Sequence, residues 1–207
     1  HCTAWNRFVR MSGETLGASD SMDVDKLPAD SREEKFVMVA APTYSNSEVI
    51  NVDLEKKDAN TGELFQNDGL WHNSSPNYSP SVLIDGILNR GDKRLNTTWV
   101  PNDNDPAYLT FTLNDTYKFY GLRYYQPENW NNIKKFDLEV SDDNGVTWTF
   151  LKTFSEPNTN TKQGWIDFGL NSSYNCNKIR MTVKSTIQGY QIYLDEVEFL
   201  LEKTTNI

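Results

Sequence analysis

The stretch from residue 133 to residue 154, IKKFDLEVSDDNGVTWTFLKTF, constrains the fold of this chain more than any other. Its first half alternates apolar and charged residues, as a strand does when one face is buried and the other is wet. The apolar positions are Phe136, Leu138 and Val140. The turn Asp142-Asp143-Asn144-Gly145 follows, and an Asn-Gly pair readily adopts the positive φ angles that close a hairpin. The second half alternates again, which places Val146, Trp148 and Phe150 on one face.

A hairpin with a Trp and a Phe on one face needs a second layer to cover those rings. The rest of the chain provides short apolar segments of strand length, separated by turn-rich loops. The clearest are residues 107–113, 119–125, 165–170, 178–184 and 192–201. We find no long helix signal, no internal repeat and no alternation of strands with helices. The pattern therefore predicts an all-β sandwich.

The same residues carry a family resemblance. The segment FDLEVSDDNGVTW resembles the strand, Ser-Asp-Gly turn and Trp signature of discoidin domains, also called coagulation factor five/eight type C domains. Family 32 carbohydrate-binding modules are close relatives of these domains. Further similar segments occur in the family's order: SVLIDG, NTTW, AYLTFTLN, YGLRYYQP and IYLDEVEFLLE. The resemblance spans about residues 75–203 and implies a discoidin-like jelly-roll β-sandwich, with an irregular N-terminal extension.

We divide the chain into three parts. Residues 1–34 are mostly polar and charged beyond Gly13, as is typical of an arm or linker. Residues 35–70 include KFVMVAA and EVINVDLEKK, two plausible strands. These strands either pack on the main domain, which we favour, or are the remnant of a preceding domain. Residues 71–207 form the expected discoidin-like sandwich.

Charge and motif content exclude several functions. The formal net charge is −9 and no basic face is visible, which argues against nucleic acid as a partner. An anionic membrane would be repelled, and the loop tips are rich in Asn and Asp rather than apolar, so we expect no binding to membrane lipid. The chain lacks the common hydrolase and phosphate-loop motifs, and it has only two histidines, His1 and His72. We therefore expect a binding module that is not an enzyme.

The resemblance implies that a sugar is held by loops at one end of the sandwich. Such a site needs an exposed flat ring beside polar groups. Three loops offer these groups, and the candidates are Asn102, Asp103, Asn104, Glu128, Asn129, Trp130, Asn131, Gln188 and Tyr190. Trp130 is the main candidate, although it could instead fold back onto the sheet. His72 beside Trp71 forms a second cluster. Glu128 stands where galactose-binding members often carry an arginine, which weakens the expectation of simple galactose binding.

The resemblance also implies a structural Ca²⁺ where the Asp-Gly loop meets the last strand. Matched by position, its ligands are Asp85, Thr97 and Glu196. Calcium favours oxygen ligands of this kind. In the alternative interpretation Asp85 caps a turn, Thr97 is a loop hydroxyl and Glu196 is an ordinary charged residue. The loop over residues 87–96 is longer than is usual in the family, which weakens the match.

The sequence thus predicts a non-catalytic, lectin-like module that recognises terminal sugars of glycans, in an extracellular or cell-surface setting. The alternative is a protein-adhesion or structural module of a larger surface protein, which would present the same loops to a protein partner. The residues set neither the sugar nor the oligomeric state. They also leave open whether Cys2 and Cys176 pair.

Overall fold

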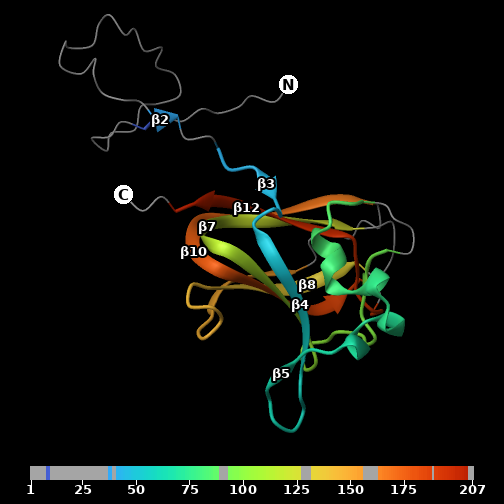
Figure 1. The fold of residues 1–207 in the computed structure, drawn as a ribbon. Coiled ribbons are helices and arrows are strands. Elements are labelled where there is room, and N and C mark those ends of the chain that lie inside the picture. Colours follow the sequence, from blue (N-terminus) through green and yellow to red (C-terminus); the bar gives the residue numbers. More distant parts are fainter. Residues whose placement is uncertain are drawn as a thin grey trace, which may run out of the picture. The chain divides into compact units, whose positions relative to one another are not determined.

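The computed structural model describes residues 8–9, 37–38, 41–88, 93–126, 132–155, 163–187 and 189–204. The chain divides into two compact units, His1–Thr43 and Tyr44–Ile207. In the first unit, β1 (Phe8–Val9) pairs antiparallel with β2 (Val37–Met38). The second unit contains the β-sandwich (Figure 1). The domain boundaries expected at residues 34 and 70 stay predictions.

The second unit confirms the all-β jelly-roll prediction. Its strands are β3 (Tyr44–Ser45), β4 (Val49–Lys57), β5 (Leu64–Phe65), β6 (Leu95–Asn96), β7 (Ala107–Gln126), β8 (Ile133–Ser141), β9 (Thr149–Ser155), β10 (Gly164–Thr186), β11 (Tyr193–Leu194) and β12 (Glu196–Lys203). Four short 3-10 helices lie between β5 and β6: η3 (Asp68–Leu70), η4 (His72–Ser74), η5 (Pro76–Tyr78) and η6 (Pro80–Ile84). Most of the segment SVLIDG lies in η6, which begins at Pro80.

Two long strands join the two layers of the sandwich. β7 and β10 pair antiparallel along most of their lengths, with register shifts between Gly169 and Tyr174 and between Cys176 and Lys178. Each therefore covers two segments that the sequence pattern separated into two strands. At one end of the β7–β10 pair, the strand order is β4–β7–β10–β8–β9, and this sheet is called the first layer. At the other end the order is β3–β12–β7–β10, which is the second layer. Strands that bend from one layer into the other are a common way to close a sandwich, and Figure 1 shows both curving through the molecule.

The core lies between these layers and is rich in aromatic rings. Phe111 of β7 and Phe199 of β12 meet edge to face with ring centroids 4.9 Å apart. Phe136 of β8 and Phe168 of β10 meet in the same way at 5.0 Å. Ring pairs at these distances stabilise a core beyond the burial of their area alone. Cys176 of β10 is a free, fully buried thiol, and burial raises its pKa to about 12.

The predicted hairpin is present, but the burial expected for its second half is wrong. The turn residues Asn144 and Gly145 have φ angles of 63° and 91°, as an Asn-Gly hairpin requires. However, Val146 is 81% exposed and Phe150 is 56% exposed. The register of β8 and β9 shifts between Leu138 and Glu139, so that Glu139 lies opposite Phe150. An inserted residue of this kind reverses the alternation of faces, and it turns Phe150 to the outside.

Other residues fill the place that the pattern assigned to Trp148 and Phe150. Phe154, at the other end of β9, stacks on Phe136 with ring centroids 5.2 Å apart. Trp148 is half-buried, and the guanidinium of Arg180 lies 3.5 Å from the centroid of its ring. Trp148 is therefore part of the outer surface of the sheet and not of the core.

The strand predicted near residues 48–57 is present as β4, which pairs with β7 in the first layer. A register shift between Val49 and Asn51 leaves Ile50 64% exposed, whereas Val52 and Leu54 are buried against the core.

Within the described ranges, no helix is long enough and apolar enough to span a bilayer.

Candidate functional site

A small two-stranded ribbon forms the floor of the first candidate pocket. β6 and β11 pair antiparallel, with Asn96 opposite Tyr193 and Leu95 opposite Leu194. Because side chains alternate between the faces of a strand, the two leucines turn together into the core, where neither is exposed. Asn96 and Tyr193 both line the pocket.

Hydrogen bonds fix the 3-10 turns against this ribbon. Trp71 forms an isolated bridge with Thr97, and the Thr98 N–H donates to the carbonyl of Leu70 at 3.0 Å. The Thr97 hydroxyl accepts from the N–H of Ile192 at 3.0 Å and donates to the carbonyl of Trp99 at 2.8 Å. These bonds tie three separate segments together, and they hold the residue after Trp71, which is His72, beside the ribbon.

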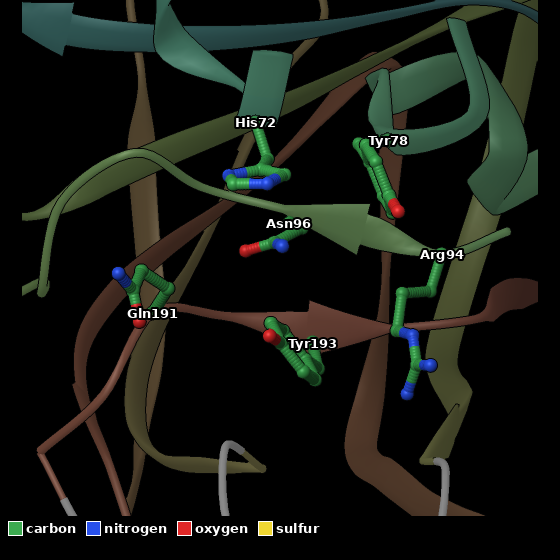
Figure 2. Close-up of a pocket in the computed structure, with 6 residues that line it drawn as sticks. All are labelled: His72, Tyr78, Arg94, Asn96, Gln191 and Tyr193. Atoms are coloured by element: carbon green, nitrogen blue, oxygen red, sulfur yellow. The ribbon is translucent and has the colours of Figure 1, made fainter. Parts of the chain in front are cut away.

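Aromatic and cationic side chains complete the walls. His72 and Tyr78 meet edge to face with ring centroids 5.4 Å apart. The backbone N–H of Arg94 donates to the carbonyl of Asn77 at 3.0 Å, which joins the ribbon to η5. The Arg94 guanidinium lies 5.0 Å from the centroid of the Tyr193 ring. Figure 2 shows these side chains gathered around the β6–β11 ribbon.

The resulting cavity, here called the ribbon pocket, has a volume of about 210 Å³. Its lining residues are His72, Tyr78, Arg94, Asn96, Gln191 and Tyr193. Every one of these side chains can donate or accept hydrogen bonds, and three of them also present a flat ring. The volume is below the roughly 300–1,000 Å³ of pockets for drug-sized molecules. The pocket therefore suits one small ring that carries several hydroxyl groups.

The structure leaves most of the predicted sugar-binding residues untested. Five of them lie outside the described residues: Glu128, Asn129, Trp130, Asn131 and Gln188. The other four do not line the ribbon pocket: Asn102, Asp103, Asn104 and Tyr190. The side chain of Asn102 accepts from the N–H groups of Asn104 and Asp105 and so closes its own turn. Tyr190 is exposed, and its backbone is held by the hydroxyl of Thr186.

Sequence reasoning singled out His72 but missed the other five residues of the ribbon pocket. A usable signal was present, because Arg94 and Asn96 are two residues apart, as are Gln191 and Tyr193. In an extended chain residues spaced by two share a face. What the sequence did not show is that the two segments pair with each other, since nearly one hundred residues separate them.

A second polar cluster lies where the Asp-Gly turn meets β12. Glu196 is 1% exposed, and its carboxylate oxygens accept from the N–H of Gly86 at 3.3 and 3.2 Å. The side-chain amide of Asn46 donates to the same carboxylate. Burial raises the pKa of Glu196 to about 8, and the negative charge of Asp85 adds to the rise. A buried carboxylate beside another acid favours a bound proton or a bound cation.

The fit of this cluster to the expected Ca²⁺ ligands is partial. Asp85 and Glu196 interact, and carboxylates are the oxygen ligands that calcium favours. The Thr97 hydroxyl, in contrast, is already engaged by Trp99 and Ile192. In the described part of the chain, no group of three or more His, Cys, Asp or Glu residues is placed to hold a metal ion.

Comparisons with known proteins identify the family and the fold of the chain. The family model of the F5/8 type C domain matches residues 67–196. No curated protein matches the chain. Among solved structures, the chain is similar to CBM32-1 from a family 31 glycoside hydrolase of Clostridium perfringens, with 16% identity and a TM-score of 0.52 over 74% of this chain and 97% of that one.

Two further structures are similar to the chain. One is a CBM32 module of Clostridium perfringens in complex with GalNAc-β-1,3-galactose, with 16% identity and a TM-score of 0.51 over 72% of this chain and 94% of that one. The other is a fragment of a putative chitobiase from Bacteroides thetaiotaomicron, with 20% identity and a TM-score of 0.51 over 63% of this chain and 80% of that one. At these identities the similarity shows a shared fold.

Proposed function

This chain belongs to the F5/8 type C domain family, and from that premise we propose that it is a non-catalytic carbohydrate-binding module. The observation that carries the proposal is the ribbon pocket, in which an imidazole, a guanidinium, two carboxamides and two phenol rings converge. Its ligand would be the terminal sugar of a glycan. The similar Clostridium perfringens module in complex with an amino-sugar disaccharide supports this ligand class. We place the function outside the cell or at its surface.

The chemistry of the pocket matches the two faces of a sugar ring. Arg94 is held over the Tyr193 ring and can donate two hydrogen bonds from one plane to neighbouring hydroxyls. Asn96 is largely buried, and its side chain offers both a donor and an acceptor. His72 adds a further group of this kind. Tyr78 and Tyr193 present ring surface to the apolar C–H face of the sugar.

The expected affinity is modest. The pocket is small, with room for one ring rather than for a long chain. Dissociation constants in the micromolar to millimolar range, roughly −4 to −8 kcal/mol, are in keeping with such a site.

A glycan array tests the proposal directly. The whole chain is applied to immobilised glycans, once with Ca²⁺ and once with EDTA. We expect a defined group of glycans that share a terminal sugar to give signals. A blank array under both conditions would overturn the proposal and would favour the protein-adhesion alternative.

We also propose that Asp85 and Glu196 hold a structural Ca²⁺. The support is the pair itself, since a buried acid beside a second acid is stabilised by a cation in the same way as by a proton. The Thr97 hydroxyl has other partners, so the proposal rests on the two carboxylates. The ion would neutralise the pair and fix the Asp-Gly turn against β12.

The pH dependence of stability tests this assignment. The pKa of Glu196 is about 8 in the folded chain and about 4.3 in an unfolded one. Without Ca²⁺, the folded state therefore holds a proton that the unfolded state has released. We expect the free energy of unfolding to fall by roughly 2–4 kcal/mol as the pH rises from about 5 to about 8, after discounting for partial solvent screening. Urea denaturation at a series of pH values measures it.

Saturating Ca²⁺ should reverse this trend, because a cation stabilises the ionised carboxylate. The variant Glu196→Gln should lose both the pH slope and the response to Ca²⁺. Glu63→Gln is the matched control, since Glu63 is exposed on the β4–β5 connection and should leave both unchanged. An equal response to Ca²⁺ in Glu196→Gln and in the original chain would contradict the assignment.

A further inference from the structure

The outer surface of the first layer carries a second pocket, here called the sheet-face pocket. Its volume is about 370 Å³, which is larger than that of the ribbon pocket. Its walls include Lys57, Asp103, Asn104, Tyr108, Arg180 and Lys184. None of its lining residues lines the ribbon pocket.

Strand register explains why these side chains meet. Residues that lie opposite one another in neighbouring strands share a face of the sheet. One such row crosses four strands, from β9 through β8 and β10 to β7: Phe150, Glu139, Arg180 and Thr110. The next row follows in the same strand order: Thr153, Asp137, Thr182 and Tyr108. The loop before β7 adds Asp103 and Asn104 at the edge.

Opposite charges balance within the pocket. Three cations and three anions line it: Lys57, Arg180, Lys184, Asp103, Asp137 and Glu139. Lys184 pairs with Asp137 at 2.5 Å, and Lys135, just outside the lining, pairs with Asp103 at 2.8 Å. The pocket therefore has no net charge to select an ion, and the chain as a whole is acidic, which disfavours a polyanion.

Arg180 lines the pocket, and its hydrogen bonding is incomplete within the described part of the chain. Its side chain is 13% exposed, and its ion pair with Glu139 spans 4.0 Å. Its Nε lies buried without a hydrogen-bond partner among the described residues. The guanidinium carbon lies over the Trp148 ring at 3.5 Å from its centroid, and 5.8 Å from the centroid of the Tyr108 ring. A buried donor without an acceptor is costly, and Arg180 also lines the pocket, so a ligand oxygen that bonds to its guanidinium would be stabilising.

We propose that the sheet-face pocket is a second binding site, for a neutral saccharide. Both donor and acceptor side chains line its walls, and a ligand with hydroxyl groups on neighbouring carbons can bond to both at once. Tyr108 and the exposed ring of Phe150 supply flat apolar surface on the same face of the sheet. The inference extends the proposed carbohydrate binding to a surface that the ribbon pocket does not share.

The experiment removes each pocket in turn and uses neutral oligosaccharides as probes. The probes are immobilised cello-, xylo-, manno-, malto-, galacto- and chito-oligosaccharides. The variant Arg94→Ala/Tyr193→Ala inactivates the ribbon pocket and should keep signals on at least one series. Adding Lys57→Ala/Asp103→Ala should lower those signals at least tenfold. Adding Lys203→Ala/Asp115→Ala instead is the matched control, because this exposed pair carries the same charges at 3.5 Å outside both pockets.

The outcomes separate the two proposals. The sheet-face site is overturned if the Arg94→Ala/Tyr193→Ala variant is silent on every probe while the original chain binds. It is also overturned if Lys57→Ala/Asp103→Ala acts no differently from the control pair. Equal signals from the original chain and from Arg94→Ala/Tyr193→Ala would overturn the ribbon pocket alone, and an original chain silent on every probe overturns both. Circular dichroism spectra identical to that of the original chain show that the variants are folded.

Discussion

Replacing Arg94 with alanine should lower the affinity for a recognised glycan about 100-fold. A hydrogen bond from a charged group contributes about 1.5–3 kcal/mol, and about 1.4 kcal/mol corresponds to a factor of ten. The guanidinium lies over the Tyr193 ring, so it is already oriented before a sugar arrives. Its removal takes away donors at a fixed position and also uncovers the ring. Isothermal titration with the strongest glycan from the array measures the change.

Two tyrosines provide the internal control for this prediction. Tyr193 lines the ribbon pocket, whereas Tyr190 is 49% exposed and does not line it. Tyr193→Ala should weaken glycan binding as strongly as Arg94→Ala, and Tyr190→Ala should leave it within about a factor of two. The reverse result would place the sugar at the loop predicted from the sequence. A melting temperature unchanged in all three variants would show that the losses are local.

Replacing Phe136 with alanine should lower the free energy of unfolding by about 3–5 kcal/mol. Phe136 has no exposed surface, and its ring contacts those of Phe154, Phe168 and Tyr124. Truncation would leave a cavity between rings that cannot all move to fill it. Stabilities of 5–15 kcal/mol are usual for a domain, so the loss would be a large part of the total. Urea denaturation followed by circular dichroism measures it.

Phe150 is the matched control for Phe136. It lies on β9, the strand next to Phe136, but its ring is 56% exposed on the outer face. Phe150→Ala should cost no more than about 0.5 kcal/mol, as is usual for surface substitutions. A loss above about 2 kcal/mol for Phe150→Ala would show that the register shift between Leu138 and Glu139 is misplaced.

The sequence pattern predicted the strands of this fold better than it predicted their faces. The alternation in residues 135–140 and the Asn144-Gly145 turn were sufficient to place β8 and the hairpin. The same reasoning predicted that Phe150 is in the core, because it assumed strict alternation of faces and did not allow for an inserted residue. A register shift is set by what the strand packs against, and that partner is far away in the sequence.

The sequence did not reveal the ribbon pocket, for a related reason, and the predicted loop site stays a prediction. The search for a sugar site looked for an exposed Trp in a polar loop, and it chose Trp130, which lies outside the described residues. The ribbon pocket instead takes its rings from Tyr78 and Tyr193 and its cation from Arg94. Each of these is an ordinary residue of its own segment. They become a site only when β6 pairs with β11 and the 3-10 turns pack beside them.

By itself, the sequence determined the features that depend on neighbouring residues: the alternation of strands, the Asn-Gly turn, and the Asp85-Gly86 turn. It also determined the family, because the short family signatures follow one another along the chain in the family's order. The tertiary structure alone decided which strands pair, where the register shifts, and which side chains from segments about one hundred residues apart share a pocket. The physical reason is that burial and pairing depend on long-range packing, which local preference does not encode.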